Sequence, residues 1–170
     1  MKTLIKIFFA IVVSIAALQP LMAQTKAEKN AKQEAIIKEL VNNKHFVFQA
    51  TYALPTYGTQ RYLNSYYDVR FTGDSLVSYL PYFGVAYSGV GYNSSTDNGI
   101  KFTSTKFDYK AQQKQNGSWY IIMKPKDVSN GVQMTFNIQT NGNADLNVIS
   151  QNRQSIRFTG SIVPEDKKRK

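Results

Sequence analysis

The chain has 170 residues, a formal net charge of +10 and no cysteine. Without cysteine, the chain has no disulfides, no thiol chemistry and no lipid attached through an N-terminal cysteine. The basic residues are scattered rather than gathered on a recognisable reading element, so nucleic acid is not an expected partner.

Residues 1–23 have the pattern of a secretory signal peptide. Lys2 and Lys6 flank the start of an apolar run from Leu4 to Leu18, and Ala23 is a small residue suited to cleavage. The run is shorter than the roughly 20 residues of a membrane span. We therefore expect a periplasmic or secreted protein that is soluble after cleavage. Its basic tail, residues 165–170, favours at most weak contact with an anionic membrane surface.

Residues 24–44 predict a helical N-terminal extension. Its apolar side chains share one narrow helical stripe, and the remaining positions are mostly polar. The residues of the stripe are Ile36, Ile37, Leu40 and Val41.

From His45 onward the apolar pattern changes to a period of two, which predicts an antiparallel β domain over residues 45–164. Asn-Gly pairs favour the tight turns between such strands. They occur at Asn98-Gly99, Asn116-Gly117, Asn130-Gly131 and Asn141-Gly142. We expect eight or nine strands, depending on whether residues 100–115 form two strands or one strand with a bulge near Thr105.

The expected fold is all-β with an N-terminal helix. Short connections favour an antiparallel meander, and closure into a lipocalin-like barrel would remove its exposed edges. The alternative is a strongly bent open sheet with the helix laid across its concave face. Periodicity alone leaves both architectures open.

No catalytic group of residues emerges from the sequence, so we predict a protein that is not an enzyme and that needs no metal or cofactor. His45 is the only histidine and has no local Ser-His-Asp signature. The acidic residues of the β region fall mostly at turns or on solvent-facing positions, without metal-ligand spacing.

Aromatic residues instead mark a candidate recognition surface. Residues 79–92 interleave tyrosine and phenylalanine with glycine, and the loop at 53–60 could lie beside them. The predicted contact residues are Tyr79, Pro81, Tyr82, Phe83, Gly84, Tyr87, Tyr92 and Tyr57. The plainer interpretation is that these tyrosines only pack on a pleated, half-exposed face.

Two segments carry a resemblance to a known family: SYLPYFGVAY at residues 78–87 and SQNRQSIRFTG at residues 150–160. They resemble the exported bacterial domain-of-unknown-function 4251 family, over roughly residues 40–163. In that family a basic residue commonly follows LPYFG, where this chain has Val85, so a role for that charge does not carry over. The resemblance implies a secreted or envelope-located β protein and supplies no catalytic residues.

These patterns lead to the hypothesis of an exported binding protein. Its first expected ligand is a small apolar or amphipathic molecule held in the barrel or at its mouth, with the 79–92 segment at the rim. The alternative is a protein-interaction module, an inhibitor or an adaptor for an envelope protein, that presents the same tyrosines. Whether the barrel is hollow or filled stays open.

Overall fold

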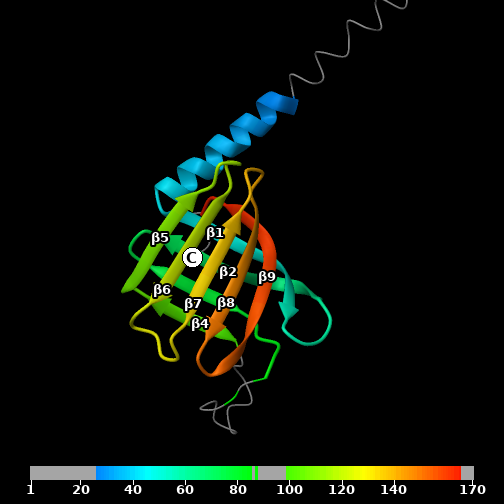
Figure 1. Cartoon of the computed structure of the whole chain (residues 1–170), viewed down its shortest axis with the longest axis vertical. Helices are drawn as coiled ribbons and strands as arrows, with labels where there is room; N and C mark the ends of the chain where they lie inside the picture. The colour runs from blue at the N-terminus through cyan, green and yellow to red at the C-terminus, as the bar shows by residue number, and fades with distance from the viewer. Residues whose placement is uncertain (1–25, 86, 88–98, 166–170) are drawn as a thin grey trace, which may run out of the picture.

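The computed structural model describes residues 26–85, 87 and 99–165, which form one helix and nine strands (Figure 1). The expected signal peptide, Tyr92 and the tail residues 166–170 lie outside this part of the chain. The helix spans residues 26–42. The strands are β1 (His45–Pro55), β2 (Arg61–Thr72), β3 (Leu76–Leu80), β4 (Ile100–Ser104), β5 (Phe107–Gln113), β6 (Trp119–Pro125), β7 (Gln133–Ile138), β8 (Asn143–Ser150) and β9 (Arg153–Val163).

The nine strands form a single antiparallel sheet that is nearly closed into a barrel. Its order is β4-β3-β2-β1-β9-β8-β7-β6-β5, so consecutive strands pair everywhere except at β4 and β5. The pairing of β1 with β9 joins the two halves. In Figure 1 strands β5 to β9 run across the front, and the strands that begin the sheet cross behind them. The expected all-β meander with an N-terminal helix is confirmed, and β4 and β5 are its two edges.

The chain bends sharply between β4 and β5, at the position where the apolar phase of the sequence slips. Thr105 and Lys106 connect the two strands. The carboxylate of Asp127 accepts hydrogen bonds from both of their backbone N–H groups, at 2.9 and 3.2 Å, and from the hydroxyl of Ser104. Residues 100–115 therefore hold two strands rather than one, and the bend carries the chain from the rear strands to the front ones.

A bulge interrupts the pairing of β1 with β2. Ala50 pairs with Tyr67, but the next pair is Tyr52 with Tyr62, so Thr51 alone faces residues 63–66. The pairing of β1 with β9 shifts at the same point. The expected loop at 53–60 shrinks to residues 56–60, because β1 continues to Pro55, whereas β2 begins at Arg61 as expected from the loop's end.

Side chains fill the interior of the barrel. Five phenylalanines are almost completely buried. The ring of Phe46 meets those of Phe71 and Phe136 edge to face, at centroid distances of 5.5 and 6.1 Å. The five are Phe46, Phe48, Phe71, Phe136 and Phe158. Burial of each such side chain stabilises the fold by about 1.5–3 kcal/mol. Large buried side chains therefore occupy the interior of the barrel.

The helix covers one end of the barrel (Figure 1). Ile37 and Val41 are 1% and 2% exposed against the core, whereas the neighbouring Ile36, turned away from the core, is 43% exposed. The hydroxyl of Tyr109 on β5 donates to the Val41 carbonyl oxygen at 3.3 Å. Within the described residues, no helix has the length and apolar character needed to cross a membrane.

Candidate functional site

The segment after β3 crosses the end of the barrel opposite the helix and is tied to the start of β9. The backbone N–H of Tyr87 donates to the Asn152 carbonyl at 2.8 Å, and that of Gln154 donates to the Val85 carbonyl at 3.1 Å. The hydroxyl of Tyr82 lies within hydrogen-bonding distance of two carbonyl oxygens, those of Val85 at 3.0 Å and Gln154 at 3.1 Å. These contacts hold residues 81–85 and Tyr87 against the barrel end.

Gly84 leaves room for the Tyr82 side chain. A Cβ atom at residue 84 would lie 2.6 Å from the Tyr82 hydroxyl oxygen, well inside van der Waals contact. The glycine therefore lets the phenol fold back over its own segment and reach the two carbonyl groups.

Beside Tyr82 lies a pocket of about 130 Å³, which we call the mouth pocket. Its apolar wall comes from β4, the β6–β7 loop, β8 and β9, and its rim is polar. The apolar residues are Ile100, Phe102, Val128, Val132, Val148 and Ile156. The polar rim includes Lys101, Asn130, Asn152, Arg153 and Gln154.

Arg153 connects Tyr82 and Gly99 at the rim of the mouth pocket. Its guanidinium lies 5.0 Å from the centre of the Tyr82 ring, and its Nη1 donates to the Gly99 carbonyl oxygen at 3.1 Å. Burial raises the pKa of the Tyr82 phenol, and the charge of Arg153 opposes this only in part. Tyr82 is therefore a neutral hydrogen-bond donor at physiological pH.

Phe83 lines a different groove on the other side of the same segment. This groove, of about 170 Å³, also contains Tyr57, Arg61 and Gly84. The Arg61 guanidinium lies 4.7 Å from the centre of the Phe83 ring, and Tyr57 is 76% exposed. The structure thus places the Tyr57 loop next to Phe83, as the sequence suggested.

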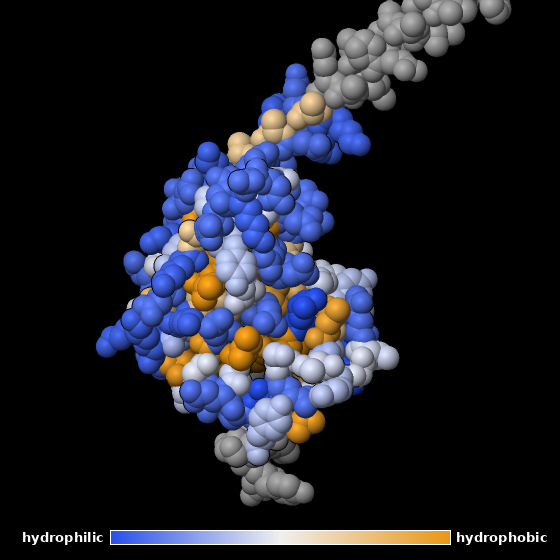
Figure 2. Space-filling view, in the orientation of Figure 1, coloured by the Kyte–Doolittle hydropathy of each residue, from blue (hydrophilic) through white to orange (hydrophobic). Residues whose placement is uncertain are grey.

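Among the described residues, the other members of the predicted set do not join these two depressions into one surface. Tyr79 lies on β3, where its ring stacks on Tyr67 at 5.7 Å and contacts Lys101. Pro81 is half-buried, and the side chain of Tyr87 is 65% exposed although its backbone N–H is anchored. The face made by β5 to β9 mixes hydrophobic and hydrophilic residues without a uniformly hydrophobic side (Figure 2).

Sequence reasoning missed most of the mouth pocket. Phe102, Val128 and Val148 belong to three separate elements, so no local spacing connects them to Tyr82. Arg153 stood within the SQNRQSIRFTG segment, but nothing in that segment indicated that its side chain covers a tyrosine ring.

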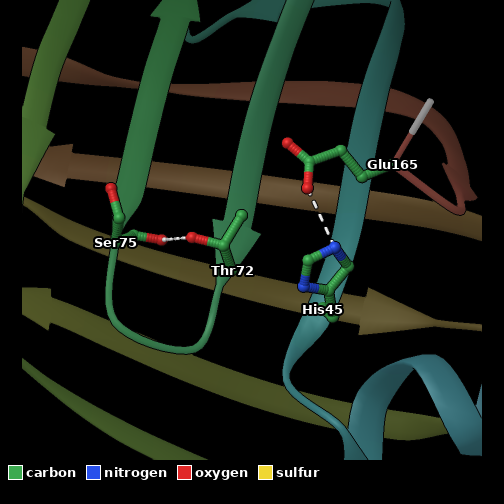
Figure 3. A network of polar contacts seen from close by, with 4 residues as sticks. All are labelled: His45, Thr72, Ser75 and Glu165. Carbon is green, nitrogen blue, oxygen red and sulfur yellow. Dashed lines mark hydrogen bonds and ion pairs between the residues drawn. The ribbon is translucent and has the colours of Figure 1, made fainter. Parts of the chain in front are cut away.

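His45 pairs with a carboxylate at the helix end of the barrel. Its Nε2 lies 2.8 Å from Oε2 of Glu165, just after β9 (Figure 3). The hydroxyl of neighbouring Thr72 directs its hydrogen bond to the Ser75 carbonyl oxygen at 3.5 Å. The pair of His45 and Glu165 therefore fastens the end of β9 to the start of β1. Among the described residues, no group of three acidic, histidine or cysteine side chains gathers to hold a metal.

The fold is that of an all-β, barrel-like protein with a helix at one end and the mouth pocket at the other. A family model described as domain of unknown function (DUF4251) matches residues 28–162, and the chain belongs to that family. The fold is similar to the crystal structure of a DUF4251 family protein from Bacteroides eggerthii DSM 20697, with a TM-score of 0.60 and 16% identity over 79% of this chain and 89% of that one. No curated protein matches the sequence.

Proposed function

We propose that this chain is an exported binding protein that holds the apolar part of a small amphipathic ligand in the mouth pocket. The observation that carries the proposal is a pocket with apolar walls and a polar rim at the end of a barrel whose interior is filled. The basic and then apolar sequence of residues 1–23 supports export.

The size of the pocket limits the ligand. Its volume of about 130 Å³ is close to that of an engineered cavity of about 150 Å³ that takes up benzene. Pockets for drug-sized ligands measure about 300–1,000 Å³. One ring or a short hydrocarbon chain therefore fits inside, and the polar part of the ligand rests on the rim.

The rim selects the charge of the ligand. Lys101 and Arg153 are the charged residues among the described lining, which contains no carboxylate. A neutral or anionic head group is therefore favoured over a cationic one.

Binding of 1-hexanol and hexanoate, followed by saturation-transfer NMR, tests this proposal. Val128→Phe fills the pocket from a half-buried loop position and should weaken binding at least tenfold. Phe83→Leu is the matched control, because its side chain lines the other groove and should leave binding unchanged. Equal binding by both variants, or no saturable binding by the unsubstituted protein, would contradict the proposal.

A second candidate function is interaction with an envelope protein through the groove at Tyr57, Phe83 and Arg61. Aromatic and arginine side chains dominate the binding energy of protein interfaces, and here they occur together around an exposed tyrosine. A photo-crosslinking residue at position 57 should capture one defined protein in intact cells. The same residue at position 120, on the outer side of β6, is the control and should not capture it. Identical products at both positions would refute the interaction.

A further inference from the structure

The bulge between β1 and β2 opens a hollow in the sheet, distinct from the mouth pocket. Because residues 63–66 of β2 face Thr51 alone, the two strands separate and leave a volume of about 340 Å³. Bulges interrupt the hydrogen-bond ladder and occur preferentially beside functional sites, where they redirect side chains. Here the bulge directs three tyrosines, Tyr62, Tyr66 and Tyr67, to one depression.

Neighbouring rings hold two of these tyrosines in place. Tyr62 meets Tyr52 edge to face at 5.4 Å, and Tyr67 stacks on Tyr79 at 5.7 Å. Tyr62 and Tyr66 are nevertheless 67% and 79% exposed, so much of their ring surface faces solvent. Rings fixed in this way lose little conformational freedom when a ligand stacks on them.

The polar groups of the hollow are amides, hydroxyls and one compensated carboxylate. Gln49 and Asn64 contribute side-chain amides, and Ser161 contributes a hydroxyl. Oδ2 of Asp68 accepts a hydrogen bond from Nε of Arg70 at 3.1 Å, which balances its charge. The hollow therefore combines donors and acceptors with aromatic faces while carrying little net charge.

From this combination we infer that the hollow binds a neutral, polyhydroxylated ring, that is, a saccharide. The C–H face of a sugar ring matches an exposed tyrosine face, and its hydroxyls match the amides and the carboxylate. A purely apolar ligand would bury those polar groups without partners, and a charged ligand would find no uncompensated counter-charge in the described lining. This inference concerns a different site from the mouth pocket and stands without it.

Titration of the full chain with neutral monosaccharides and oligosaccharides, by calorimetry and on a glycan array, tests this inference. At least one neutral saccharide should bind, and the comparison of single rings with longer chains shows whether a free sugar or a glycan is preferred. Tyr66→Ala and Asn64→Ala should each lower its affinity at least tenfold. Tyr57→Ala is the matched control, since Tyr57 is equally exposed but lies outside the hollow.

Three results would overturn the inference. The first is the absence of binding across the neutral saccharides, and the second is binding that Tyr66→Ala leaves unchanged. The third is preferential binding of a proline-rich peptide, which also docks on aromatic surfaces. All of these variants alter exposed side chains, and circular dichroism with thermal unfolding serves as a check that they are folded.

Discussion

The phenol of Tyr109 joins the sheet to the helix through its hydrogen bond to the Val41 carbonyl oxygen, and its pKa is shifted. Burial raises the pKa of Tyr109 from its ordinary value of 10.0 to about 12. In the unfolded chain the phenol loses its proton at lower pH, so its contribution to stability is complete below pH 10 and is lost as the pH rises toward 12. The stability advantage of the unsubstituted protein over Tyr109→Phe should therefore be constant from pH 8 to about pH 9 and smaller at pH 11 in urea unfolding. A constant difference would show that the phenol titrates normally.

Asp127 acts at the bend between β4 and β5. Its hydrogen bonds, that from Ser104 first, lower the pKa of the Asp127 carboxyl below the ordinary 3.8. A lowered pKa stabilises the fold above that ordinary value, and the contribution disappears as the pH falls below it. Asp127→Asn should lower the unfolding midpoint at pH 7, and its difference from the unsubstituted protein should narrow below pH 4. Asp108→Asn is the control, because Asp108 makes only an exposed ion pair with Lys126 and should change little. An Asp127→Asn midpoint equal to that of the unsubstituted protein at pH 7 would contradict this role.

At the level of elements, β1 and β9 approach so closely that only glycine fits at residue 160. A Cβ atom there would clash with the carbonyl oxygen of Gln49, a backbone atom that can give way only if the strand shifts. Gly160→Ala should force the strands apart beside the Thr51 bulge and cost about 1–3 kcal/mol or more. Chemical denaturation measures this loss, and an unchanged free energy of unfolding would mean that the strands adjust freely.

The helix docks on the barrel through Ile37 and Val41, whereas Ile36 of the same apolar stripe stays exposed. Ile37→Ala should cost about 2–4 kcal/mol, because a buried side chain is lost against the core. Ile36→Ala, one residue away but 43% exposed, should change the free energy of unfolding by less than about 0.5 kcal/mol. Similar losses for both variants would contradict the observed orientation of the helix.

Local patterns predicted the elements better than their irregularities. The stripe of Ile37 and Val41 predicted the helix, and the phase slip near Thr105 marked an irregularity but left open whether it was a bulge in one strand or the junction of two, which the structure shows as β4 and β5. The bulge opposite Thr51 was not foreseen, because residues 63–66 leave the alternation that identifies a strand. Tyr82 was correctly placed at the end of the barrel, but its partners in the pocket come from distant segments that only the folded sheet brings together.

At the scale of the whole molecule, the filled interior limits what the barrel can do. Alternation of apolar residues is the same in a hollow barrel and in a packed one, so the sequence left this point open. Five buried phenylalanines occupy the space that an internal ligand would need. We therefore expect recognition at depressions on the outside of the described part of the chain, among them the end pocket, the Tyr57 groove and the hollow at the bulge.

Methyl chemical-shift mapping during titration with 1-hexanol tests this account most directly. Saturable shifts should appear at Val128, Val148 and Ile100 around the mouth pocket, while the interior methyls of Leu76 and Ile121 stay in place. Shifts centred on the interior methyls, or none at the mouth pocket, would contradict the account.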